Sequence, residues 1–195
     1  MKRISDFFDQ CCELYGDSGW EAAAWSSRKV QQDMFYVLSR VGISGSVLDV
    51  GCGQGDYYSF LRGHYPKTEY TGIDISKKMI EISQDKYPLA KFQLVDLADY
   101  HEHHDWVVGA GPFNFKIGND ETQRNYIHKQ IQKMYELANK GVSLSFLANK
   151  MAKEKFEELH YYDPVEIVDF CFGVTNRVVL DHATLSSQFV VYLLR

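Results

Sequence analysis

The chain has 195 residues, of which 45% are hydrophobic and 24% charged, and its formal net charge is -5. This length and balance predict one soluble globular domain with a full-sized core and exclude a disordered chain. The acidic balance argues against a broad nucleic-acid-binding surface, which carries a basic excess. No stretch of the sequence approaches the roughly 18 uncharged apolar residues of a membrane span.

The cysteines and the start of the chain indicate a cytoplasmic protein with free thiols. The cysteines at positions 11, 12, 52 and 171 form no C-x-x-C pair, so their spacing offers neither a zinc knuckle nor a redox motif. Acidic residues interrupt the first 17 residues, where a signal peptide would need an unbroken apolar segment. A reducing compartment is the expected setting for such cysteines.

The first 45 residues are predicted to be helical with irregular parts. Apolar residues between Val30 and Val41 repeat at helical spacing, which places them on one face of a helix. Gly42 follows as a stop signal.

From residue 46 onward, strand-like and helix-like segments alternate. Strands are predicted at 46–50, 68–75, 90–97, 104–111, 141–149, 176–183 and 187–195, and helices at 56–65, 76–87, 120–140 and 163–173. Helical crossovers between strands indicate an α/β fold with a doubly wound parallel sheet covered on both faces. The last two strands are joined by too few residues for a crossover helix, so they are expected to be antiparallel.

Two helix starts carry specific capping signals. Ser76 is the expected N-cap of the helix that follows the second strand. Asp163 is the expected N-cap of the last helix, with Pro164 at its first position and Glu166 three residues after the cap.

A glycine-rich loop, GCGQG at residues 51–55, follows the first strand directly. A dinucleotide-binding turn has the pattern G-x-G-x-x-G, but here Asp56 stands where the third glycine should be. Asp49 and Asp56 flank the loop and would repel the pyrophosphate of a nicotinamide dinucleotide, which needs bare amides at a helix N-terminus. The loop therefore favours a ligand with a cationic end, and a nicotinamide-linked dehydrogenase is the less favoured alternative.

Two further carboxylates stand at the ends of the next strands. Asp74 can accept hydrogen bonds from both hydroxyls of a ribose, because a carboxylate offers two acceptor oxygens. Asp96 can accept the exocyclic amine of an adenine, and Leu97 can donate its backbone N–H to the ring. Each acid alone would be an ordinary strand-end turn residue, but together with the loop they describe S-adenosylmethionine.

Four segments, VLDVGCGQGD, YTGIDIS, FQLVDLAD and DWVVGAG, resemble in order and spacing motifs I to IV of the class I S-adenosylmethionine-dependent methyltransferases. The resemblance covers roughly residues 46–195 and extends to small stand-alone bacterial members of the family. It implies a Rossmann-like sheet of seven strands with the last strand antiparallel. The cofactor-binding positions expected from it are Asp49, Gly51, Cys52, Gly53, Gly55, Asp74, Ile75, Asp96, Leu97 and Gly109.

The resemblance also implies what these positions do. Asp49, Gly51 and Gly53 would surround the methionine moiety, Asp74 would hold the ribose, and the adenine would lie beyond the third strand. Cys52 is expected to fill space inside the loop and not to act as a nucleophile, because nothing basic lies beside it in sequence.

The chain is thus interpreted as one methyltransferase domain, 1–195, with a helical lid at 1–45 and a cofactor-binding core at 46–195. Family members often close the cofactor site with such an element, and Trp25 is expected to cover the adenosyl group and exclude water. The alternative is that the aromatic residues of this segment, such as Tyr15 and Trp20, pack on the sheet as core.

No general base is indicated, so the catalytic residues are left unassigned. Relatives that methylate base amines carry an Asn/Asp/Ser-Pro-Pro-aromatic run after the fourth strand, which Gly111 to Asn114 match only in one proline and one aromatic residue. Phe113 and Asn114 line a pocket in one interpretation, and Phe113 and Phe115 pack inward in the other. His160 or a neighbouring tyrosine could supply a base.

A histidine-rich run, HEHHDW, connects the third and fourth strands. Its spacing offers no obvious additional carboxylate or cysteine ligand, so a solvated turn is favoured over a metal site, and no metal is expected.

The sequence therefore predicts a methyltransferase that uses S-adenosylmethionine, yields S-adenosylhomocysteine and methylates a small molecule on oxygen or nitrogen. A nucleic-acid partner is disfavoured by the charge, and a membrane partner is not expected. The alternatives are a non-catalytic module that binds the cofactor or its product and regulates a partner, or a nucleic-acid or protein methyltransferase. The acceptor and the oligomeric state are not determined by the sequence.

Overall fold

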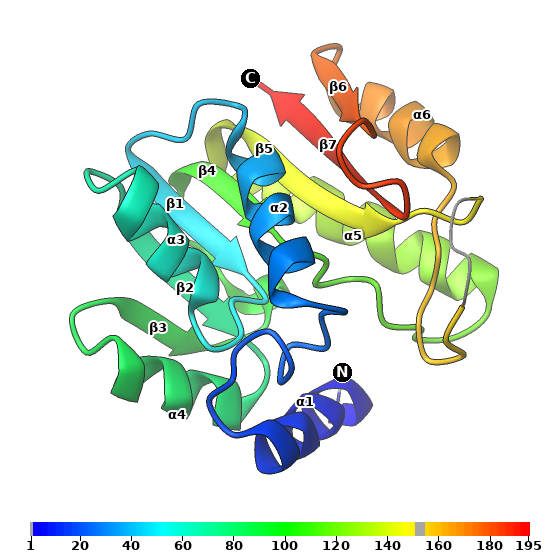
Figure 1. Cartoon of the computed structure of the whole chain (residues 1–195). Coiled ribbons are helices and arrows are strands. Elements are labelled where there is room, and N and C mark those ends of the chain that lie inside the picture. Colours follow the sequence, from blue (N-terminus) through cyan, green and yellow to red (C-terminus); the bar gives the residue numbers. More distant parts are fainter. Residues whose placement is uncertain (1, 151–154) are drawn as a thin grey trace.

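The computed structural model describes residues 2–150 and 155–195 (Figure 1). Its strands are β1 (Ser46–Val50), β2 (Glu69–Asp74), β3 (Lys91–Leu94), β4 (His104–Gly109), β5 (Ala138–Leu147), β6 (Val178–Asp181) and β7 (Gln188–Leu194). Its helices are α1 (Lys2–Tyr15), α2 (Arg28–Ser39), α3 (Asp56–His64), α4 (Lys77–Lys86), α5 (Asp120–Leu137) and α6 (Pro164–Val174), and a 3-10 turn spans Leu97–Asp99.

The seven strands form one sheet in the order β3-β2-β1-β4-β5-β7-β6. β7 pairs antiparallel with both of its neighbours, and the other recorded pairs are parallel, so the predicted mixed sheet with an antiparallel last strand is confirmed. The chain winds outward from β1 to β3 on one side and from β4 to β5 on the other. In such sheets a crevice forms where the direction of winding reverses, here between β1 and β4.

Two apolar layers cover the faces of the sheet. On one face, Met34 and Leu38 of α2 pack with Leu61 of α3 against the buried side chains of β1 and β4. On the other face, Ile131 of α5 and Cys171 of α6 belong to the larger cluster. Figure 1 shows these helix pairs on opposite sides of the sheet.

The two predicted helix caps are confirmed. The Ser76 hydroxyl accepts the N–H of Met79 at 3.1 Å, and the Asp163 carboxylate accepts the N–H of Val165 at 2.9 Å. Pro164 occupies the first turn of α6, where its missing N–H costs nothing.

One element boundary differs from the prediction. The sequence placed Ala138 on the stripe of a helix ending near residue 140 and began the strand at Gly141, but Ala138 has extended backbone and pairs with His104 of β4. Ala138 is buried in the larger cluster, and a shift in pairing between His104 and Trp106 accommodates the added residues. Strand pairing therefore decides the boundary, because the helical stripe alone does not show where the chain enters the sheet.

A buried glutamine fixes the segment that follows β4. The side chain of Gln123 on α5 is 0% exposed; its amide nitrogen donates to the Tyr162 hydroxyl at 2.7 Å, and its amide oxygen accepts the N–H of Ile117 at 3.0 Å. The Tyr162 hydroxyl in turn donates to the Phe113 carbonyl at 2.6 Å. The loop is therefore held in one conformation by side chains from two distant parts of the chain.

We predict that Gln123→Ala lowers the free energy of unfolding by about 2–3 kcal/mol, because it leaves buried backbone groups of the loop without partners. Gln132→Ala, an exposed glutamine on the same helix, is the matched control and should change it by less than about 0.5 kcal/mol. Urea denaturation of both variants measures the difference. Equal stability of the two variants would contradict the role given to Gln123.

Candidate active site

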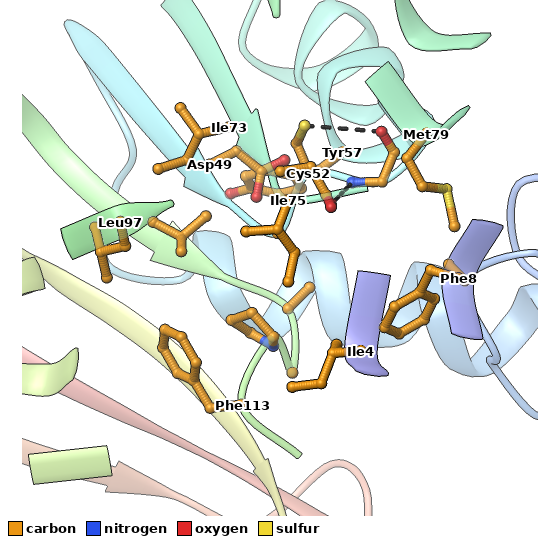
Figure 2. Close-up of a pocket in the computed structure, with 18 of the residues that line it drawn as sticks. Ile4, Phe8, Asp49, Cys52, Tyr57, Ile73, Ile75, Met79, Leu97 and Phe113 are labelled. Atoms are coloured by element: carbon orange, nitrogen blue, oxygen red, sulfur yellow. Dashed lines mark hydrogen bonds between the residues drawn. The ribbon is translucent and has the colours of Figure 1, made fainter. Parts of the chain in front are cut away.

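A pocket opens at the carboxyl ends of β1, β2 and β4, at the place where the winding reverses (Figure 2). Most of the positions predicted from the sequence line it, including residues from three strand ends, the glycine loop and the N-terminal segment. These are Asp49, Gly51, Cys52, Gly53, Asp74, Ile75, Asp96, Leu97 and Trp25. Gly55 and Gly109 are absent from the lining.

The glycine loop needs left-handed backbone at positions that border the pocket. Gly51 has a φ of 70°, and a Cβ there would lie 2.7 Å from the Cβ of Pro112, so the loop after β4 approaches the glycine loop closely. Gly53 has a φ of 52°, and its Cβ would point between Met79 and Ala23, which both line the pocket. Residues with side chains are disfavoured at such φ values.

Gly55 and Gly109 are required for packing instead. A Cβ on Gly55 would lie 2.8 Å from the ring of Phe92, behind the loop. A Cβ on Gly109 would lie 2.9 Å from a methyl group of Leu144. Both glycines therefore support the shape of the site from outside its lining.

Asp74 fastens the end of β2 to the glycine loop. One carboxylate oxygen accepts the N–H of Gly53 at 2.9 Å, and the other accepts the N–H of Ser76 at 2.9 Å. Burial raises the pKa of Asp74, while these N–H donors oppose that rise. Each carboxylate oxygen has two acceptor positions, so Asp74 keeps the capacity to accept hydroxyl groups of a ligand.

Asp49 is more deeply buried. It is 2% exposed, and one of its oxygens accepts the hydroxyl of Tyr70 at 2.7 Å. Burial, and to a lesser degree the charges of Asp74 and Asp56, raise the pKa of Asp49 to about 7, against the lowering effect of the Tyr70 hydrogen bond. A cationic ligand group beside Asp49 would favour its ionised form.

Asp96 and Leu97 follow the carboxyl end of β3. The Asp96 carboxylate accepts the N–H of Ala98 at 3.0 Å and so begins the short 3-10 turn. Leu97 is buried, and Tyr126 of α5 lines the pocket nearby. The parallel sheet thus brings carboxylates from three consecutive strand ends to one edge of the molecule.

Cys52 has a packing role in the loop. Its thiol is buried beside Ile80 and Phe92, and it stands against Gly72, where a Cβ would be only 2.8 Å from the Cys52 Cβ. Burial raises the pKa of the thiol well above its usual range, which disfavours the nucleophilic thiolate.

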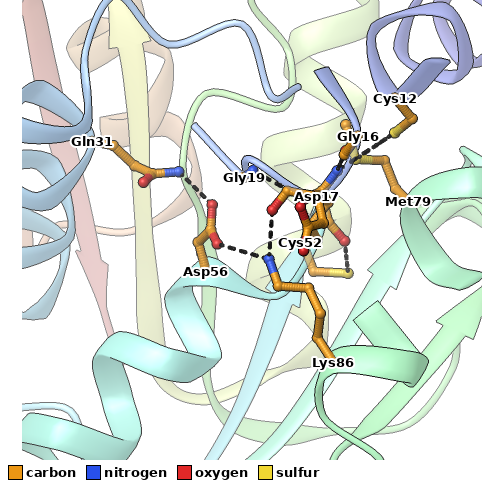
Figure 3. Close-up of polar contacts among 11 residues, drawn as sticks. Cys12, Gly16, Asp17, Gly19, Gln31, Cys52, Asp56, Met79 and Lys86 are labelled. Carbon is orange, nitrogen blue, oxygen red and sulfur yellow. Dashed lines mark hydrogen bonds and ion pairs between the residues drawn. The ribbon is translucent and has the colours of Figure 1, made fainter. Parts of the chain in front are cut away.

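The N-terminal segment is tied to the glycine loop through Gln54, a residue that the sequence analysis did not select. Its side chain is 1% exposed; its amide nitrogen donates to the Gly16 carbonyl at 2.7 Å, and its amide oxygen accepts the N–H of Gly19 at 3.0 Å. Figure 3 shows the surrounding contacts, in which Asp56 accepts from Gln31 at 2.8 Å. The signal available in the sequence was the position of Gln54, a polar residue between Gly53 and Gly55 in the loop.

Helix α1 covers the pocket from the side of α4. Asp9 accepts the Ser76 hydroxyl at 2.5 Å, and Ile4 and Phe8 of the same helix line the pocket. Trp25 also lines it, with its ring edge-on to Phe35 at a centroid distance of 6.4 Å. The first 45 residues therefore contribute directly to the walls of the pocket.

The loop after β4 agrees in part with each of the two predictions, that its residues line a pocket or that they pack inward. Phe113 lines the pocket and is buried. Asn114 does not line the pocket, because its side-chain oxygen accepts the N–H of Leu147 at 3.1 Å. Phe115 packs inward, with its ring 5.0 Å from that of Phe7.

The histidine candidates lie away from this pocket. His160 and its neighbours Tyr161 and Tyr162 line a second pocket between α5 and α6, which separates these base candidates from the glycine loop. In the HEHHDW run, His104 is paired with the Tyr100 hydroxyl at 2.8 Å. Among the described residues, no group of three or more His, Cys, Asp or Glu residues is arranged to hold a metal ion.

Residues 47–141 match a family model described as a methyltransferase domain. A Mycobacterium tuberculosis protein with a provisional methyltransferase name is 27% identical over 129 residues, which cover 65% of this chain and 78% of that protein. Malonyl-[acyl-carrier protein] O-methyltransferase of Priestia megaterium is 26% identical over 119 residues, covering 59% of this chain and 40% of the relative. Trans-aconitate 2-methyltransferase of Paracidovorax citrulli is 36% identical over 64 residues, covering 32% and 25%. The chain thus spans less than half the length of each of these last two relatives.

Solved structures share the fold over the full chain. Magnesium protoporphyrin IX methyltransferase from Synechocystis with bound S-adenosylhomocysteine has a TM-score of 0.69 and 17% identity, covering 100% of this chain and 98% of that one. The plantazolicin methyltransferase BpumL with the same ligand has a TM-score of 0.66 and 13% identity, covering 100% and 97%. At these identities the likeness concerns the fold.

We predict that Gln54→Ala loosens the N-terminal segment, because Gly16 and Gly19 lose their hydrogen bonds to the glycine loop. Limited proteolysis should cleave residues 15–25 at least several times faster in this variant than in the wild type. Gln10→Ala, an exposed glutamine on α1, is the control and should be cleaved like the wild type. Unchanged cleavage of the Gln54 variant would mean that other contacts hold the segment.

Asp49 should make stability depend on pH in a definite direction. Its pKa is higher in the folded chain than in the unfolded chain, so its contribution to the free energy of unfolding is fully present below about pH 4 and is lost as the pH rises through about 7. Asp49→Asn removes this contribution to the pH dependence. Denaturant melts from pH 4.5 to 7.5 should show the wild type losing stability relative to the variant, and a constant difference would contradict the raised pKa.

Proposed function

Because the chain belongs to the class I S-adenosylmethionine-dependent methyltransferases, we propose that it methylates a small-molecule acceptor on oxygen or nitrogen. The observation that carries the proposal is the pocket itself, whose walls come from the glycine loop, three strand ends and the N-terminal helix. Several similar proteins are named for small acceptors, among them trans-aconitate and magnesium protoporphyrin IX.

The described residues fit the cofactor. Gly53 leaves open space toward Met79 and Ala23 that a Cβ would occupy, which suits close approach of a ligand to the backbone. We assign Asp74 to the ribose hydroxyls, and Asp49 to the cationic amino-acid end. Asp96 would accept the adenine amine.

When bound, the cofactor would supply a methyl group on a positively charged sulfur, which the acceptor's lone pair would take and which would leave S-adenosylhomocysteine. The chain's own task is to align the acceptor and to exclude water. Phe113 and the α1 side chains Ile4 and Phe8 wall the space where an acceptor would lie. The base that takes the acceptor's proton is left unassigned; the described lining of the pocket includes no histidine or lysine.

We further propose that residues 1–45 act as the lid of this site. Gln54 fixes the lid to the glycine loop, and Asp9 fixes α1 to the start of α4. Trp25 stands in the wall and is assigned to cover the adenosyl group.

Within the described ranges, the helices are too short or too polar to cross a bilayer.

The proposal predicts where label goes when the protein is incubated with methyl-labelled S-adenosylmethionine and a cell extract divided by size. Label should enter the low-molecular-weight fraction and not the protein or nucleic-acid fractions. Asp74→Ala should abolish this transfer at low cofactor concentration, because loss of a hydrogen-bonding carboxylate weakens binding about 10–100-fold.

Asp85→Ala, an exposed carboxylate on α4, is the matched control and should transfer label like the wild type. Calorimetry with S-adenosylhomocysteine checks the binding of both variants directly. Label confined to macromolecules would contradict the small-molecule acceptor, and unchanged affinity in a folded Asp74→Ala protein would contradict the ribose assignment.

A further inference from the structure

The charge and shape of the pocket restrict the acceptor that the proposed methyltransferase can take. We infer that the acceptor is an uncharged molecule with an apolar, ring-sized body, and not a carboxylate. The inference rests on the proposed function and concerns the same site.

The described lining is acidic and contains no cationic side chain of its own. Its charged side chains are Asp49, Asp56, Asp74 and Asp96, and its described members include no lysine, arginine or histidine. Lys86 is outside the lining; its ammonium group pairs with the Asp56 carboxylate at 4.0 Å and donates to the Asp17 carbonyl at 3.1 Å (Figure 3).

The acceptor side of the pocket is apolar. Figure 2 shows Ile4 lying between Phe8 and Phe113, across the pocket from Asp49. The backbone of Phe113 is held by the Tyr162 hydroxyl at 2.6 Å, so this wall is fixed in place. Pro112 lines the pocket beside Phe113, which makes a surface suited to a flat apolar group.

A carboxylate acceptor would be buried here without a partner. Removing an anion from water is costly unless a cation or several donors replace the water, and the described lining supplies no cationic side chain. The nearby guanidinium of Arg3 lies 6.0 Å from the centre of the Phe115 ring and is outside the lining. The named acceptors of the trans-aconitate and malonyl relatives both carry carboxylates, so this chain should differ from them.

A cationic acceptor is also disfavoured. The wall formed by Ile4, Phe8 and Phe113 offers no carboxylate to an ammonium group. The cofactor's sulfonium carries positive charge at the point of transfer, and a protonated amine has no lone pair to give. A neutral acceptor needs no charged partner, either at the acidic strand ends or at the apolar wall.

Matched ring probes test the inference. The protein is first titrated with S-adenosylhomocysteine, and then the loaded protein is titrated by calorimetry with 2-naphthol, 2-naphthoate, 2-naphthylmethylammonium and trans-aconitate. We expect 2-naphthol to bind at least about tenfold more tightly than any of the charged probes. Phe8→Ala should weaken 2-naphthol binding severalfold, whereas Leu14→Ala, an exposed apolar residue on the same helix, should not.

Each other outcome overturns the inference. Tighter or equal binding of 2-naphthoate or trans-aconitate would show that the pocket accepts anions, and Arg3→Ala would then reveal whether Arg3 is recruited. Tighter binding of the ammonium probe, or binding of no probe at all, would show that the apolar wall is not an acceptor surface. Failure of the loading titration itself would instead count against the proposed function.

Discussion

The site depends on the hydrogen bond between the Asp74 carboxylate and the N–H of Gly53, which joins the end of β2 to the left-handed loop after β1. The same carboxylate also accepts the N–H of Ser76, which begins α4. This one half-buried acid therefore fixes the relative position of two strand ends and a helix start. A methyl-transfer site needs this rigidity, because alignment of donor and acceptor supplies much of the rate.

The N-terminal segment is connected to this loop by side chains buried between them. Gln54 binds the backbone on either side of residues 17 and 18, and Gln31 of α2 binds Asp56. Asp9 extends the connection from α1 to α4. The N-terminal segment thus both lines the pocket, through Ile4 and Phe8, and contacts the glycine loop.

The sequence predicted the fold and most of the residues that line the pocket, because both depend on local patterns. Alternating apolar segments indicate the sheet, and an acid such as Asp74 at a strand end is visible in the sequence. The contacts of Gln54 and Gln123 could not be predicted, because each joins segments far apart in the chain and neither belongs to a periodic pattern. The end of α5 was misplaced for a related reason, since pairing of Ala138 with His104 is a long-range event.

Amide hydrogen exchange with and without S-adenosylhomocysteine tests the central claim, that Asp74 and the glycine loop form the cofactor site. Protection should increase at residues 51–55, 74–76 and 96–98, where the loop and the strand ends line the pocket. The lid residues 16–25 should also gain protection. Unchanged exchange at Gly53, or protection confined to the second pocket between α5 and α6, would contradict this placement.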